Sequence, residues 1–231
     1  MNCWICGNVA DSREHRIKAS DIALHIGSVS PENPLFMRGN NFIQKRIHSK
    51  RSRLFQYKKT ICSDCNSNRT QRYDKSWETL SKYFYEKDSY LKRVNRWSPA
   101  RVFRGCSVRK MKEVQLFFIK NFGCFCVDQA VPLDLKNLAQ SLINGEPNRN
   151  FYLRFSRLKS VSQNQKSALM TPLNVLEHKQ TREIPVAFTH YVVGSLVVEQ
   201  FYLINPNWRK HLKALWSPFD KQKSYLLYKE L

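Results

Sequence analysis

The sequence lacks any run of about 18 apolar residues, which excludes a transmembrane helix of ordinary length. Its first four residues, Met1-Asn2-Cys3-Trp4, have neither the charged start nor the apolar core of a signal peptide. Internal repeats, heptad arrays and low-complexity tracts are absent as well. The 231 residues are 42% apolar, so they can bury the core of one large domain or two small ones. We therefore expect a globular cytoplasmic protein without a membrane segment.

Acidic residues are also scarce. The chain has 18 Asp and Glu against 39 Lys and Arg, which gives a formal net charge of +21. Such an excess repels itself and is normally relieved by a polyanion. Nucleic acid is the leading candidate for that partner, and an anionic membrane surface is the second.

One long stretch has no acidic residue at all, between Glu32 and Asp64. It holds eight cations: Arg38, Lys45, Arg46, Lys50, Arg51, Arg53, Lys58 and Lys59. We predict that these side chains contact phosphates, which raises affinity and salt sensitivity without reading a base sequence. The alternative is an ordinary solvated loop.

Seven cysteines are present, an odd number, and four of them form two Cys-x-x-Cys pairs. The pairs are Cys3–Cys6 and Cys62–Cys65. This spacing is typical of zinc ligands in a reducing compartment rather than of disulfides. Four thiolates close a tetrahedral zinc site and leave no open position, so we predict a structural zinc. Four unrelated buried thiols are the alternative.

Glu14 and His15 follow the first pair, and Asn66 directly follows the second. A carboxylate suits a hard cation such as Mg²⁺, and an adjacent histidine can take a proton from an attacking water. Asn66 would supply a second oxygen ligand. Together they predict a single-metal site for phosphodiester hydrolysis. The alternatives are a solvated Glu-His pair in a loop and a helix N-cap at Asn66.

Residues 3–90 resemble an HNH endonuclease of the zinc-stabilised ββα-metal kind. The order Cys-x-x-Cys, acid-His, Cys-x-x-Cys and then Asn matches that family. The resemblance implies that His15 is the general base and that Glu14 and Asn66 hold a catalytic Mg²⁺ or Mn²⁺. It also implies that zinc is held by the four cysteines: Cys3, Cys6, Cys62 and Cys65.

The chain departs from the family pattern at two places. After the histidine, residues 16–19 lack the family's proline, and the position of its middle asparagine holds Tyr57. The group that orients His15 is therefore Gln56, or it is supplied by Asn40 or Asn41, or it is missing.

Cations and an acid also follow the second Cys-x-x-Cys pair. Arg69 and Arg72 are further candidates for contact with nucleic acid. Asp74 either touches the catalytic metal or pairs with a neighbouring side chain on the helix surface.

The predicted fold class is α+β, with an HNH module in residues 1–95 and an α+β domain for substrate or partner binding in residues 96–231. We expect helices over residues 20–25, 66–87 with a break near 73, 111–122 and 135–142, the last ended by Gly145 and Pro147. We expect strands over residues 150–157, 173–177, 184–193, 195–204 and 224–228, with a tight hairpin or a bulge at Gly194.

The sequence thus predicts a metal-dependent endonuclease. The resemblance favours double-stranded DNA as the substrate, and the family's usual contexts are phage defence and mobile elements. One alternative is a zinc-stabilised nucleic-acid-binding protein whose HNH site is degenerate. Another is a nuclease subunit that a regulatory protein partner controls.

Overall fold

The computed structural model describes residues 1–38, 44–94, 96–158, 168–179, 181, 183–220 and 225–226, with the side chains of 37, 38, 44, 225 and 226 left out. Its centre is an antiparallel sheet in the order β4-β8-β7-β5, with β6 also paired to β7. The strands are β4 (Phe151–Arg157), β5 (Ala168–Met170), β6 (Asn174–Leu176), β7 (Val186–Val193) and β8 (Leu196–Leu203). The predicted tight hairpin is confirmed, because Gly194, with φ +58°, turns β7 into β8.

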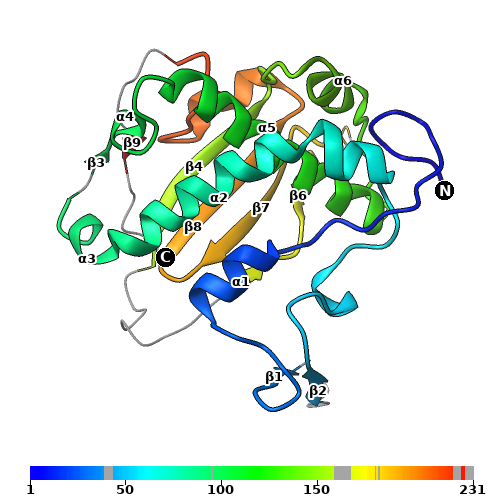
Figure 1. Ribbon diagram of the computed structural model, residues 1–231. Coiled ribbons are helices and arrows are strands. Elements are labelled where there is room, and N and C mark those ends of the chain that lie inside the picture. The colour runs from blue at the N-terminus through cyan, green and yellow to red at the C-terminus, as the bar shows by residue number, and fades with distance from the viewer. Residues whose placement is uncertain are drawn as a thin grey trace.

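Both faces of this sheet are covered, which explains why β8 is buried along its whole length. One face packs against α2 (Gln71–Glu86) and α5 (Ser107–Asp128), as Figure 1 shows. The other face packs against Trp208, Leu212 and Leu215, which belong to η3 (Pro206–His211) and the segment after it. A strand that is buried on both faces has a mostly apolar sequence, without the alternation of polar and apolar residues seen when one face meets water.

The helix α5 crosses the middle of the molecule and is buried on almost every side. Trp77 of α2 stacks on Phe117 of α5, with the ring centroids 5.6 Å apart and the planes 7° from parallel. The other helices are α1 (Ala19–His25), α3 (Asp88–Leu91), α4 (Pro99–Val102) and α6 (Lys136–Asn144). The predicted end of α6 is confirmed, because Gly145 follows it in a left-handed conformation.

The predicted helix over residues 66–87 is two elements. A π-helix, η2 (Asp64–Arg69), contains Cys65, the last cysteine of the second pair. The helix α2 begins after Thr70, so the break lies there and not near Tyr73. The Thr70 hydroxyl donates to the carbonyl of Cys65 at 2.8 Å, which ties the turn between the two helices.

Two small ribbons lie outside the main sheet. β1 (Leu35–Arg38) and β2 (Gln44–Ile47) form an antiparallel hairpin that projects from the body in Figure 1, followed by η1 (Arg53–Phe55). β3 (Arg96–Trp97) pairs with β9 (Tyr225–Leu226), which lies inside the predicted strand over residues 224–228.

Besides the small cluster on the η3 face of the sheet, one large hydrophobic cluster runs through the described part of the chain. Its members extend from Cys3 to Trp216, and both predicted segments, 1–95 and 96–231, contribute to it. The predicted α+β class, with helices and an antiparallel sheet, is confirmed. In the described part of the chain, no helix has the length and apolar character needed to cross a bilayer.

Candidate functional site

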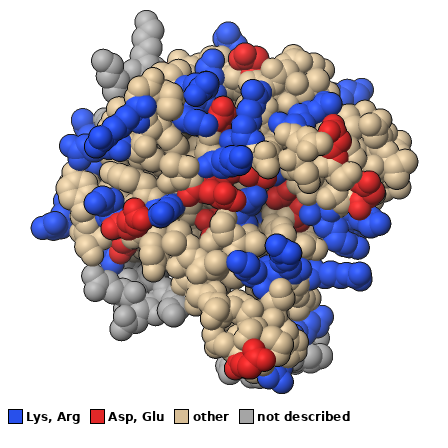
Figure 2. All heavy atoms as spheres, in the orientation of Figure 1, with Lys and Arg blue, Asp and Glu red and all other residues tan. Residues whose placement is uncertain are grey.

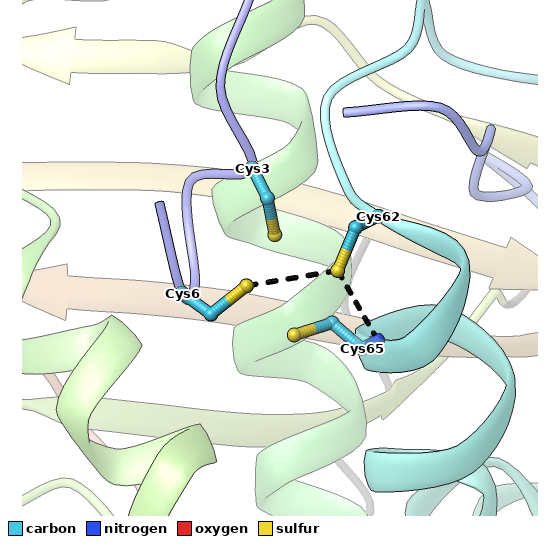
Figure 3. Close-up of side chains that lie close together, drawn as sticks. All are labelled: Cys3, Cys6, Cys62 and Cys65. Carbon is cyan, nitrogen blue, oxygen red and sulfur yellow. Dashed lines mark hydrogen bonds between the residues drawn. The ribbon is translucent and has the colours of Figure 1, made fainter. Parts of the chain in front are cut away.

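The two Cys-x-x-Cys pairs come together in one group (Figure 3). The four sulfur atoms lie within 4.8 Å of one another, and Cys6 Sγ is 3.6 Å from Cys62 Sγ. A zinc tetrahedron with Zn–S bonds of about 2.3 Å places its sulfurs about 3.8 Å apart. Three of the cysteines are buried and Cys6 is half-buried. The group could therefore hold a metal ion such as zinc.

Local backbone contacts build this group from two distant segments. In the first knuckle the Gly7 amide donates to the Cys3 carbonyl at 2.9 Å, and Gly7 has φ +81°, where glycine is unstrained. The Trp4 amide donates to the Thr60 carbonyl at 3.2 Å, which joins the knuckle to the second segment. Burial and the neighbouring thiols raise the pKa of Cys65, so four thiolates without a cation would repel one another.

An open pocket of about 370 Å³ lies beside the cysteine group. The predicted Glu14, His15 and Asn66 all line it. The remaining lining residues come from the loop before α1 and from η2 and α2: Lys18, Ser67, Gln71, Asp74, Lys75 and Glu78. The structure thus brings Asn66 together with Glu14 and His15, which precede it in the chain by 52 and 51 positions. We call this the Glu14 pocket.

Glu14 is buried, with 3% of its surface exposed, and it forms an ion pair with Lys120 of α5. The Lys120 Nζ lies 2.9 Å from Glu14 Oε2 and 2.7 Å from Asp74 Oδ1. Burial alone would lower the pKa of Lys120, but the two carboxylates raise it above its ordinary value. A fully buried ammonium therefore balances two carboxylates at the base of the pocket.

Lys120 was not among the residues predicted from the sequence. The signal was present, since this lysine is the one charged residue between Leu116 and Cys126, a stretch in which Asn121 is the only other strongly polar residue. A charge in the middle of a buried helix face needs a partner, because an unpaired buried ion is costly. Which partner it finds depends on the fold, since Glu14 is 106 residues away along the chain (120 minus 14).

His15 lies at the pocket wall and is half-buried. Burial lowers its pKa, with Glu14 opposing this shift and Lys18, Lys120 and Arg51 adding to it, so the imidazole is neutral at pH 7. Its backbone pairs with that of Gln56 as an isolated antiparallel bridge.

Of the groups predicted to orient His15, Gln56 lies beside it, with the two Nε2 atoms 3.5 Å apart. Asn40 and Asn41 fall outside the described residues. A further amide supports the same segment, because Asn121 Nδ2 of α5 donates to the His15 carbonyl at 3.1 Å.

Asn66 lies inside η2, whose N-cap is Ser63, so the N-cap alternative for Asn66 is wrong. Its Nδ2 donates to Ser12 Oγ at 3.0 Å and to the Arg13 carbonyl at 3.3 Å. These bonds tie the start of η2 to the segment that carries Glu14 and His15. Because the amide nitrogen faces that segment, the amide oxygen is the atom left for a ligand.

The predicted phosphate-contacting cations are mostly exposed: Lys45, Arg46, Arg51, Arg53, Lys58 and Lys59, with Lys50 half-buried. Arg51 lies close enough to His15 to affect its pKa. The side chain of Arg38 is outside the described residues. In Figure 2, Lys and Arg side chains surround a band of Asp and Glu on the face that carries α1 and α2.

The charged residues that follow the second Cys-x-x-Cys pair, Arg69, Arg72 and Asp74, lie in three different surroundings. Arg69 is exposed, with its Nη2 3.8 Å from Asp64 Oδ2. Asp74 binds both Lys120 and Lys18, whose Nζ is 3.0 Å from its Oδ2. Arg72 does not line the Glu14 pocket but a second one, near the start of α5.

No protein-family model, curated protein or solved structure matches the chain significantly.

Proposed function

We propose that the chain is a metal-dependent endonuclease with an HNH-type site, which hydrolyses phosphodiester bonds in DNA. The observation that carries the proposal is the common pocket of Glu14, His15 and Asn66 beside the four-cysteine group. The order of these elements along the chain resembles the HNH family, and their convergence on one pocket supports that resemblance.

Each residue of the pocket has a role in this proposal. His15, kept neutral by burial, takes a proton from the attacking water. Glu14 and Asn66 would hold Mg²⁺ or Mn²⁺, since carboxylate and amide oxygens suit a hard cation. Because Glu14 Oε2 accepts from Lys120, Glu14 would reach the cation through its other oxygen. The bound cation would neutralise charge on the phosphate and the leaving oxygen.

Zinc at the four cysteines is structural in this proposal. Four thiolates fill a tetrahedral shell, so the metal has no open position for water. Its role is to hold the segment of residues 3–15 against η2, where Asn66 lies. The cysteines also favour a reducing compartment such as the cytoplasm.

Cleavage of supercoiled plasmid with Mg²⁺ or Mn²⁺ tests the proposal. We expect His15→Ala to lower the rate about 10²- to 10⁴-fold, the usual contribution of a general base. His48→Ala is the matched control, because His48 is exposed and does not line the pocket. Equal rates for wild type and His15→Ala with both metals would refute the proposal.

A second candidate is a zinc-stabilised protein that binds nucleic acid without cutting it. The observation that favours it is Lys120, whose ammonium already balances Glu14 and Asp74. This candidate predicts salt-dependent DNA binding that His15→Ala leaves unchanged, with no cleavage by the wild type. Cleavage that appears only after co-expression with another protein would instead indicate a partner-controlled subunit.

A further inference from the structure

The second pocket, of about 720 Å³, lies between α2 and the start of α5. Its lining includes three cations, Arg72, Arg109 and Lys112, together with Ser107. Of its two acids, Glu113 is bound by Lys110 at 2.8 Å, and Glu146 is 3.9 Å from Lys112 on the exposed surface. We call this the Arg72 pocket.

The Arg72 side chain is held in place at this pocket. Its Nη2 donates to the Tyr73 hydroxyl at 3.1 Å, and its guanidinium carbon lies 5.1 Å from the centre of the Tyr73 ring. Gly145 leaves the room for it, because a Cβ at that position would lie 2.2 Å from Nη2. A guanidinium fixed in this way is prepared for a phosphate, since little side-chain freedom is lost on binding.

The segment that leads into α5, and that supplies Gly105 and Cys106 to the pocket lining, is rich in arginine. No acid occurs between Asp88 and Glu113, and five arginines in this stretch are exposed: Arg93, Arg96, Arg101, Arg104 and Arg109. Among the described residues, Arg93, Arg104 and Arg109 have no carboxylate within 4.0 Å. Figure 2 shows Lys and Arg side chains over the corner formed by α4 and the start of α5.

The two pockets lie on neighbouring sides of α2. Gln71 and Asp74 line the Glu14 pocket, while Arg72 lines the other. A helix with its side chains is about 10–12 Å wide. One DNA strand advances about 3.4 Å per nucleotide along the axis, so this width corresponds to about three nucleotides.

We propose that the Arg72 pocket binds a backbone phosphate of the nucleic acid about three nucleotides from the bond placed in the Glu14 pocket, and that the exposed arginines continue the path. One guanidinium group can donate two parallel hydrogen bonds to two oxygens of the same phosphate. The fixed guanidinium of Arg72 and the exposed arginines around it therefore suit a phosphate backbone. The inference rests on the proposed function, since it extends the same substrate beyond the cleavage site.

Binding of a short fluorescein-labelled DNA duplex, measured by anisotropy without added Mg²⁺ or Mn²⁺ and without a chelator that would remove zinc, tests this in the absence of cleavage. We expect Arg104→Gln/Arg109→Gln to weaken binding about tenfold per lost contact at roughly 0.1 M salt, and to lower the salt slope by about 0.9 per contact. Lys210→Gln/Lys213→Gln removes the same charge from exposed positions in and after η3. We expect this control to keep the wild-type salt slope and to lose only the small affinity that follows from the lower net charge.

Ser107→Asp gives a second test of the pocket itself. An acid in the first turn of α5 favours the helix, so folding is preserved while a phosphate is repelled. We expect weaker binding with an unchanged thermal unfolding transition. Duplex affinity and salt slope equal to those of wild type in both variants would overturn the proposal, as would binding of phosphatidylserine vesicles with no binding of the duplex.

The two proposals fail separately. A wild-type protein that cuts DNA, with arginine variants that bind as tightly as it does, refutes the Arg72 pocket and leaves the nuclease intact. A wild-type protein that binds DNA through these arginines but never cuts it refutes the nuclease and supports the pocket.

Discussion

The four-cysteine group and the Glu14 pocket are carried by the same two segments, residues 3–18 and 62–78, yet they are completed differently. The cysteine group takes all its members from these segments. The pocket also depends on α5, which supplies Lys120 beneath Glu14 and Asn121 behind His15. The Cys-x-x-Cys spacing is therefore sufficient to predict the cysteine group. The charge balance of the Glu14 pocket, in contrast, depends on α5, which lies far along the chain.

The largest expected effect comes from breaking the cysteine group. Because binding of structural zinc is worth about 10–16 kcal/mol in small zinc-dependent folds, Cys62→Ser/Cys65→Ser should lose zinc and expose residues 1–15 to protease. Zinc content and limited proteolysis measure this. Cys106→Ser is the control, because Cys106 lies outside the group. Unchanged zinc content in the double variant would show that these cysteines do not hold the zinc.

The next effect separates the pocket from the cysteine group. Lys120→Met leaves Glu14 and Asp74 without their buried counter-ion and should destabilise the fold by about 3–5 kcal/mol. Urea unfolding measures the loss. Adding Glu14→Gln and Asp74→Asn to the same chain should restore much of it, because no uncompensated charge is then left. If Lys120→Met is as stable as wild type, α5 does not support the pocket electrostatically.

Acid should also weaken a third contact, in which His25 of α1 lies beside Gly194 at the β7–β8 turn. Burial lowers the pKa of His25 to about 4, from 6.5. A histidine whose pKa is lowered in the folded state favours unfolding when it gains a proton. The contribution of neutral His25 to the free energy of unfolding is therefore complete above pH 6.5 and is lost as the pH falls through 4. The shift corresponds to about 3 kcal/mol.

His25→Phe tests this, because it keeps a ring against Tyr85, whose centroid is 5.1 Å from that of His25. Unfolding free energies from pH 7 to pH 4 should fall less steeply in the variant than in the wild type. Any decline that persists in His25→Phe then belongs to other groups, including proton competition for the cysteine thiolates. Parallel curves for the two proteins would contradict the assignment to His25.

The smallest expected effect concerns the orientation of His15. Gln56→Ala should lower plasmid cleavage about tenfold, the lower end of the range for residues that orient a catalytic or ligand group. Its thermal unfolding should stay close to that of wild type, since Gln56 is not part of the buried core. Gln140→Ala on the exposed side of α6 is the control. An unaltered rate would mean that Gln56 does not orient His15.

The sequence allowed the α+β class, the hairpin at Gly194 and the end of α6 at Gly145 to be predicted, because each follows from local periodicity or from glycine's freedom at positive φ. The convergence of the cysteines followed from their spacing. The start of α2 after Thr70 could not be predicted, because a hydroxyl bond to the Cys65 carbonyl decides it. The partners of Lys120 could not be predicted either, because only the packing of α5 against α2 and against the segment that carries Glu14 brings them together.

The burial of α5 also bears on when the pocket forms during synthesis. The ribosome releases the segments bearing Glu14, His15 and Asn66 well before residues 107–128, and a domain generally folds as a unit once its parts are made. Until α5 arrives, Glu14 and Asp74 have no buried ammonium between them, and the backbone at His15 has no support from Asn121. A nascent chain stalled before residue 107 would therefore hold the proposed catalytic residues without the helix that arranges them.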